Sequence, residues 1–169
     1  MKSIGIYYGS STGMTEGVAE RIAEKLGVDS AHVYNVSNAS ADTVADYEVL
    51  LLGSSTWGCG DLQDDWENFL DDLKGQDLNG KWVALFGCGD SQSYSDTFCG
   101  ALGVIYEALQ GTACRFIGAV STEGYSYDDS AAVVDGKFVG LALDEMNEDD
   151  LTDERIDAWV ESLKAEGAE

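Results

Sequence analysis

Four hydroxyl side chains and one glycine lie within residues 10–15, near the amino end of the sequence. This segment comes between an apolar run at residues 4–9 and an amphipathic stretch at 14–26, where a helix is expected to begin. The first backbone N–H groups of a helix have no partner within it, and the helix dipole adds partial positive charge there. With the hydroxyl donors, the arrangement predicts a site for a compact dianion such as a phosphate monoester. Ordinary helix capping is the alternative, although one Ser or Thr suffices for a cap. The six residues are Ser10, Ser11, Thr12, Gly13, Met14 and Thr15.

Two further loops, residues 54–61 and 88–97, each follow an apolar run that ends in glycine. Each carries one aromatic side chain that could lie over a ligand, Trp57 in the first loop and Tyr94 in the second. Aromatic residues on facing loops can enclose a flat ring system. A phosphate seat together with a site for a planar heterocycle predicts a mononucleotide ligand. At this point the alternative stays open that both rings pack on neighbouring helices.

Apolar runs typical of buried strands alternate with amphipathic stretches along the chain. Five such alternations predict an α/β fold, namely a doubly wound five-stranded parallel sheet of order 2-1-3-4-5 with helices on both faces. Ligands bind such sheets at the carboxyl ends of the strands, so the three loops are expected to converge on one edge. We expect strands near residues 4–9, 32–36, 49–53, 83–87 and 116–120, and helices near 13–26, 41–46, 62–73 and 98–109 and from an N-cap at Thr152.

Residues 121–151 are too many for an ordinary connection between a strand and a helix. They contain short strand-like segments at 124–127 and 133–140, around a turn. We therefore expect an insertion that interrupts or extends the fifth strand. No internal repeat or linker divides the sequence, and residues 1–169 are expected to form a single domain.

The charge of the chain limits its partners. Acidic residues outnumber basic ones by 32 to 9, which gives a formal net charge of −23. This charge argues against nucleic acid and anionic membranes as partners, and it favours a basic protein partner. Solubility alone is the alternative explanation for most of these charges.

The four cysteines show no CxxC or metal-finger spacing, and a single histidine, His32, is too few for a histidine-rich metal site. We expect free thiols, no bound metal, and a reducing cytoplasmic environment. His32 is expected at the surface, at the end of a strand. No apolar run reaches 18 residues and the amino end leads directly into a strand, so we expect neither a transmembrane helix nor a signal peptide.

The chain resembles flavodoxins, the small FMN-binding electron carriers, and specifically their long-chain group. The three loops in this order and spacing are far more specific than any one of them alone. The strand order given above is that of flavodoxin itself, so we expect a flavodoxin-like sheet on resemblance as well as on pattern. The stretches that carry the resemblance are residues 10–15, 56–62, 87–96 and 136–145 and the helix from 151.

The resemblance implies a role for each of the three loops. Residues 10–15 would bind the FMN phosphate, and residues 55–56 would approach the ribityl chain and the ring edge. Trp57 and Tyr94 would flank the isoalloxazine ring, and the backbone at 89–90 would bind its pyrimidine edge. The 58–59 peptide would face flavin N5 and flip on one-electron reduction, which Gly58 permits at little cost. Beyond the first loop, the implied cofactor-binding residues are Ser55, Thr56, Trp57, Gly58, Cys59, Gly60, Cys88, Gly89, Asp90, Tyr94, Asp96 and Thr97.

Several positions depart from the family pattern. Ser55 stands where many relatives carry Pro, and Met14 stands where Lys or Asn is frequent, which weakens the expected phosphate affinity. Thr97 stands where Asn is common beside the ring, and Met146 stands where a polar residue is often found. Cys59 and Cys88 are interpreted as loop fillers, with a redox-sensing role as the alternative.

The implied function is that of a low-potential one-electron carrier with no catalytic residues, shuttling between semiquinone and hydroquinone. Its implied partners are basic reductases and oxidoreductases that dock transiently on a monomer. An FMN enzyme such as a quinone reductase is the rival reading if residues 121–151 build a substrate pocket. Three other classes are disfavoured because the sequence lacks their motifs. It has no acidic cluster after the first strand, as a phosphorylation-receiver module needs. It also has no GxxxxGK[ST] for a nucleotide triphosphatase and no GxGxxG after the first strand for dinucleotide binding.

Overall fold

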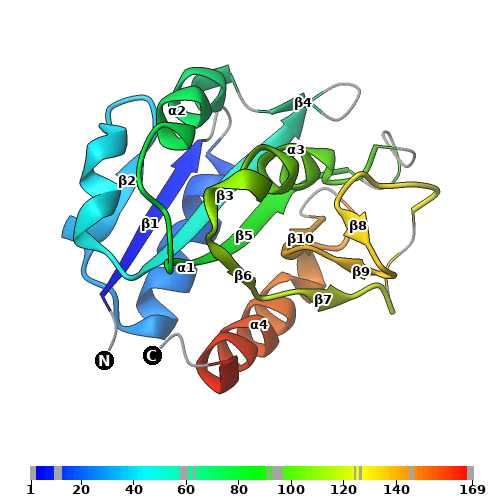
Figure 1. Ribbon diagram of the computed structural model, residues 1–169. Coiled ribbons are helices and arrows are strands. Elements are labelled where there is room, and N and C mark those ends of the chain that lie inside the picture. The colour runs from blue at the N-terminus through cyan, green and yellow to red at the C-terminus, as the bar shows by residue number, and fades with distance from the viewer. Residues whose placement is uncertain are drawn as a thin grey trace.

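The computed structural model describes residues 3–9, 13–57, 61–62, 64–90, 92, 97–123, 125, 127–144 and 147–166. Its main sheet places the strands in the order β2-β1-β3-β5, and both β6 and β10 pair with the outer edge of β5 (Figure 1). All these pairings are parallel, which confirms the predicted order 2-1-3-4-5. The strands of this sheet are β1 (Ile4–Gly9), β2 (Val33–Asn35), β3 (Val49–Trp57), β5 (Trp82–Cys88), β6 (Arg115–Ile117) and β10 (Leu141–Leu143), with β4 (Asp61–Leu62) antiparallel to the end of β3.

Glycine sets both ends of the first helix. Gly13 precedes it with a positive φ of 89°, and Gly27 ends it in the left-handed conformation, with its N–H directed to the carbonyls of Ala23 and Glu24. This agrees with the predicted start and end. The helices are α1 (Met14–Leu26), α2 (Asp64–Lys74), α3 (Gly100–Ala108) and α4 (Thr152–Glu166), with 3-10 helices at Ser30–His32, Ala41–Asp46, Gln110–Thr112 and Asp149–Leu151.

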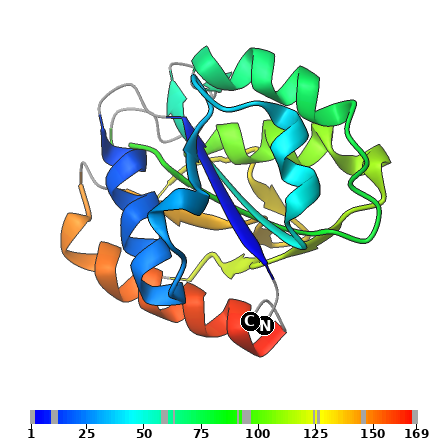
Figure 2. The ribbon, with the colours of Figure 1, turned by 90° about the vertical axis from the view of Figure 1, so that its left-hand side faces the viewer.

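The helices cover both faces of the sheet, α1 and α4 on one and α2 and α3 on the other (Figure 2). The alternation of side chains along each strand explains the two layers. In β3, Leu50 and Leu52 belong to the apolar cluster under α2 and α3, whereas Val49 and Leu51 belong to the cluster under α1 and α4. Both sets are fully buried. The continuous apolar run in the sequence therefore reflects burial on both faces.

The fifth strand is divided, as predicted. β6 pairs with the first half of β5 and β10 with the second half, so two segments far apart in sequence share one strand position. The insertion between them forms a small antiparallel sheet of order β7-β9-β8 (Figure 1). Its strands are β7 (Val120–Ser121), β8 (Val133–Val134) and β9 (Lys137–Phe138).

Several expected boundaries were wrong. The strand expected at 116–120 ends at Ile117, with Val120 in β7, and the helix expected at 98–109 begins at Gly100. β3 continues through Ser54–Trp57, and β5 includes Cys88, so these residues belong to strands and not to loops. Leu62 pairs with Thr56 in β4 and does not begin α2. Thr152 has helical dihedral angles, φ −59° and ψ −50°, because a 3-10 turn precedes it, so it is no N-cap.

The segment expected as a strand at 124–127 is not one at its described residues, Tyr125 and Tyr127. His32 is exposed at the end of a 3-10 helix, immediately before β2, as expected for a surface residue. Among the described helices, none is long and apolar enough to span a bilayer.

Candidate functional site

The carboxyl ends of β1, β3, β5 and β10 lie at one edge of the sheet (Figure 1). In this register Gly9 pairs with Ser54, and Ser55 pairs with Cys88. Cys88 also pairs with Leu143 of β10. The three predicted loops therefore leave the sheet at the same level, on neighbouring strands.

Gly53 and Gly87, two of the glycines that precede these loops, allow close packing within the sheet. A Cβ at Gly53 would lie 2.2 Å from the Phe86 ring, and a Cβ at Gly87 would lie 2.3 Å from the Ser54 carbonyl oxygen. Both glycines lie within strands and have no positive φ. They permit close packing inside the sheet, and the turns come later in the chain.

The amino end of α1 matches the predicted phosphate seat. The N-cap residue of this helix is Gly13, which has no side chain with which to cap it. Met14 is 37% exposed, whereas Thr15 is fully buried. The backbone N–H groups in the first turn of a helix are suited to binding an anion. Ser10, Ser11 and Thr12 lie outside the described residues.

A buried hydrogen bond joins the first two predicted loops. The hydroxyl oxygens of Thr15 and Ser55 lie 2.7 Å apart. Thr15 is on α1 and Ser55 is on β3, so the bond fixes the start of the helix against the neighbouring strand. Of the four hydroxyls predicted to form the seat, Thr15 therefore has a structural partner of its own.

Thr56 supports a different helix. Its Oγ1 accepts a hydrogen bond from the backbone N–H of Ala101 at 3.1 Å, within the first turn of α3. Its hydroxyl proton is still available to a ligand. The backbone of Trp57 pairs with Asp61 of β4. The predictions for the Trp57 ring and for Gly58, Cys59 and Gly60 fall outside the described part of the chain.

The third predicted loop begins at Cys88, which is buried at the end of β5. The Gly89 N–H donates to the Leu143 carbonyl oxygen at 2.8 Å, which ties the loop to β10. A Cβ at Gly89 would lie 2.8 Å from the Cys99 backbone nitrogen and 2.9 Å from its Sγ. Only glycine fits at this point of the loop.

Asp90 makes two contacts that are described. Its Oδ1 accepts from the Gln92 backbone N–H at 3.1 Å and from the Asn147 side chain at 2.8 Å. Thr97 accepts a hydrogen bond from the Gly100 N–H through its carbonyl oxygen. The predictions for Tyr94 and Asp96 fall outside the described residues.

Asn147 was missed by the sequence analysis. The side-chain nitrogen also donates to Oδ1 of Asp144 at 2.9 Å, and Asp144 is fully buried at the end of β10. The signal that could have identified these residues is their position, because polar residues that follow a strand of a doubly wound sheet lie at its ligand-binding edge.

The Cys99 thiol, which lies close to Gly89 at this edge, is unreactive because of its environment. Cys88, Cys99 and Cys114 are free cysteines, as expected for a reducing setting, and Cys59 lies outside the described residues. Burial raises the pKa of the Cys99 thiol well above its usual value. A thiol that stays protonated is a poor nucleophile. The described residues hold no cluster of three or more acidic, histidine or cysteine side chains that could bind a metal.

A doubly wound parallel sheet with a helix start at its carboxyl edge is typical of α/β proteins that bind nucleotides there. Residues 6–159 match the flavodoxin family. Flavodoxin from a Nostoc species is 47% identical over 165 residues, covering 98% of this chain and 97% of that protein. Flavodoxin 1 of Azotobacter vinelandii is 45% identical over 170 residues, covering 98% of both chains.

A solved structure gives the same result. The crystal structure of Fusobacterium nucleatum flavodoxin bound to flavin mononucleotide superimposes with a TM-score of 0.91 at 34% identity, covering 98% of this chain and 99% of that one. The chain belongs to the flavodoxin family.

Proposed function

We propose that this protein binds FMN non-covalently at the carboxyl edge of its sheet and carries single electrons between redox proteins. The observation that carries the proposal is the start of α1, which the Thr15–Ser55 bond fixes against β3 at the edge where β1, β3 and β5 end. The family supports it, as does a relative whose crystal structure contains the cofactor. FMN, when bound, supplies the redox chemistry.

The residues of the chain bind and orient the cofactor. The first turn of α1 would hold the phosphate with neutral donors. The absence of a side chain at Gly89 lets the backbone of the third loop lie close to Cys99. The bond from Gly89 N–H to Leu143 keeps this backbone in place.

The charges at this edge favour a low potential. Asp90 and Asp144 are joined through Asn147, whose amide is neutral. A unit negative charge about 10 Å from the ring, at an effective dielectric constant of about 20, opposes an added electron by about 1.7 kcal/mol. This corresponds to about 70 mV for one electron, before screening by salt. We therefore propose that the carrier works between the one-electron and two-electron reduced levels of its cofactor.

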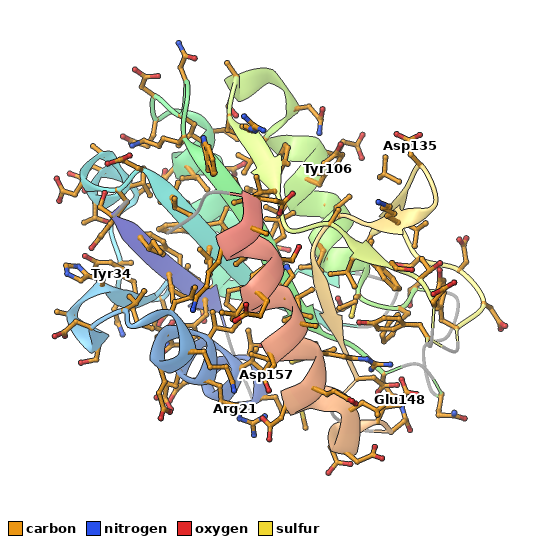
Figure 3. The ribbon with its side chains drawn as sticks, turned by 90° about the horizontal axis from the view of Figure 1, so that it is seen from below. Arg21, Tyr34, Tyr106, Asp135, Glu148 and Asp157 are labelled. Carbon is orange, nitrogen blue, oxygen red and sulfur yellow. The ribbon has the colours of Figure 1, made fainter. Side chains whose placement is uncertain are left out.

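The proposed partners are basic reductases and oxidoreductases. The chain has 32 acidic residues and 9 basic ones, and several of the basic ones are already paired within the protein. Arg21 on α1 bonds Asp153 at 3.5 Å, and Lys25 bonds Asp157, both on α4, along the line where the two helices meet (Figure 3). The unpaired acidic charge would attract a positively charged surface.

We also propose that the protein acts as a cytoplasmic monomer without a substrate of its own. An FMN enzyme remains the second candidate. The insertion would have to form its substrate pocket, but Tyr125, Tyr127 and Phe138 of the insertion pack around Phe98, which is buried. These ring contacts occupy the part of the insertion that packs at the start of α3, which favours the carrier over the enzyme.

The test is stepwise anaerobic reduction of the FMN-loaded protein, followed by its absorption spectrum. A carrier is expected to accumulate the one-electron reduced level, whereas a flavin that passes directly to the two-electron level would favour the enzyme. Steady oxidation of NAD(P)H by the pure protein would favour the enzyme as well. Electron transfer to a basic reductase should slow as ionic strength rises, and a flat dependence would contradict electrostatic docking.

A further inference from the structure

One asparagine amide lies between two carboxylates at the ring end of the site. Asn147 Nδ2 donates to Oδ1 of Asp90 at 2.8 Å and to Oδ1 of Asp144 at 2.9 Å. An amide nitrogen carries two hydrogens, one for each acceptor. Because carboxylates only accept hydrogen bonds, the nitrogen of the amide must face them and its oxygen must face away.

The two carboxylates differ in how firmly the protein holds them. Asp144 is fully buried, follows β10 directly, and also accepts the Asn147 backbone N–H at 3.2 Å. Its carbonyl oxygen accepts from the Glu148 N–H at 2.8 Å. Asp90 is partly exposed, and its other described side-chain contact is the Gln92 N–H in its own loop. Asp144 is thus the buried end of the bridge that Asn147 forms, and Asp90 is its partly exposed end.

The segment that carries Asn147 is linked to α4 and, through Arg155, to the insertion. Glu148, which lies near the start of α4, pairs with Arg155 at 3.1 Å (Figure 3). The Arg155 guanidinium lies 4.0 Å from the centre of the Tyr125 ring, and the Tyr125 hydroxyl donates to the Ala142 carbonyl oxygen at 2.7 Å. Asn147 therefore stands on a segment fixed on two sides.

We infer that Asn147 is a positioning residue for the isoalloxazine end of the site, and that it acts through Asp90. By giving one hydrogen to each carboxylate, it holds Asp90 beside Asp144 and so fixes the backbone of the loop that follows β5. Without the amide, two like charges would face each other and separate. A neutral amide joins them without adding positive charge, which keeps the ring end negative. The inference rests on the proposed function, because it takes residues 89–90 as the ring-binding segment.

The experiment uses the apoprotein and three ligands, each titrated separately: FMN, riboflavin and inorganic phosphate. Riboflavin has the ring without the phosphate, so it reports on the ring end alone. N147L has nearly the same shape but no donor, and it is expected to weaken riboflavin and FMN by the same factor of about ten. Its phosphate affinity should not change. N147D places a third carboxylate at the bridge and should weaken both flavins further.

The matched control is Asn79, an exposed asparagine in the turn before β5, at the opposite end of the sheet. N79L and N79D make the same chemical changes and should leave all three affinities within about twofold. If N147L does not fold, N147S keeps one donor for two acceptors and is expected to show a smaller, but equal, loss for both flavins.

A double-mutant cycle separates positioning from general support of the fold. In a D90A background, N147L should change riboflavin affinity by less than about twofold, because the group through which Asn147 acts is gone. A full tenfold loss in that background would overturn the inference, as would unchanged riboflavin affinity in N147L alone. Wild-type protein that binds neither flavin would overturn the proposed function together with this inference, whereas wild-type binding with an unaffected N147L would overturn the inference alone.

Discussion

The two ends of the proposed site differ in chemistry, because one carries neutral hydroxyls and the other carries carboxylates. At the proposed phosphate end, α1 begins and a buried hydrogen bond joins the neutral hydroxyls of Thr15 and Ser55. At the ring end, carboxylates of Asp90 and Asp144 meet at an amide that is exposed. In the proposed site, donors without formal charge would bind the phosphate, which is always charged, and carboxylates would lie near the ring, whose charge changes on reduction. We therefore expect the phosphate end to contribute mainly to FMN affinity and the ring end mainly to the reduction potential.

If this division is real, substitutions at one end should affect FMN and riboflavin differently from substitutions at the other. A change at the ring end should weaken both ligands equally. A change at the phosphate end should weaken FMN and leave riboflavin unaffected.

The largest effect is expected from G89A at the ring end. The new Cβ would lie 2.8 Å from the Cys99 nitrogen and 3.2 Å from Phe98 Cδ1, so the loop must move. We expect about 2 kcal/mol of lost binding, or about thirtyfold, for riboflavin and FMN alike. Titration of flavin fluorescence measures it.

The control is G17A within α1, where a Cβ has nothing within 4 Å. Replacing a helical glycine by alanine should stabilise the apoprotein by about 1 kcal/mol and leave flavin binding unchanged. Equal flavin affinity in G89A and wild type would remove Gly89 from the site.

The next effect is expected from T15V at the phosphate end. The substitution keeps the shape but leaves the buried Ser55 hydroxyl without its Thr15 partner, at a loss of about 1.5 kcal/mol. FMN affinity should fall about tenfold and riboflavin affinity should not. In the double variant T15V/S55A both hydroxyls are absent, so its loss should be smaller than the sum of the single losses. An additive result would mean that the bond does not support the seat.

A smaller effect is expected from Y125F, which removes a hydrogen bond near the segment that carries Asn147. Loss of the bond to Ala142 should lower the free energy of unfolding by about 1 kcal/mol. Burial raises the pKa of Tyr125 from 10.0 to about 12. Above pH 10 the unfolded state therefore releases this proton first, and stability is lost as pH rises from 10 to 12.

Between pH 10 and 12, the free energy of unfolding of Y125F, measured by denaturant titration, should fall less steeply with pH than that of the wild type. Part of the slope should remain, because burial also raises the pKa of Tyr7 to about 12. Identical slopes in the variant and wild type would contradict the assignment to Tyr125.

The smallest effect is expected from M14K. Met14 is 37% exposed at the start of α1, and a cation there should attract the phosphate by about 0.5 kcal/mol at low salt. FMN affinity should rise about twofold, and high salt should abolish the gain. Riboflavin serves as the internal control, since any gain in its affinity would place the effect away from the phosphate.

The fold could be predicted because its signal is local. Strands buried on both faces are apolar throughout, and the helices between them repeat apolar residues on one side. The ends of β3 were misread because Ser54 and Ser55 are polar yet buried. Their hydroxyls have partners, namely the Ser55 carbonyl oxygen for Ser54 and Thr15 for Ser55. Nothing in the sequence shows that such partners exist, so the polar run was interpreted as a loop.

The positions of some candidate site residues in the fold could also be predicted. Gly13, Met14 and Thr15 could be placed at a helix start from periodicity, and Gly89 and Asp90 after a strand. Asn147 could not, because its contact with Asp90 spans 57 residues and depends on the return of β10 to the edge of β5. A residue whose partner is set by the path of an insertion carries no periodic signal.

The divided fifth strand also sets the order in which a newly made chain can complete the site. Thr15 and Ser55 can meet once the first third of the protein has left the ribosome. The support for the ring end waits for β10 and Asn147, close to the end of the 169 residues. Contacts between distant segments also form late in folding, because their loops must close first. If the site is built as proposed, its ring end is therefore completed after its phosphate end.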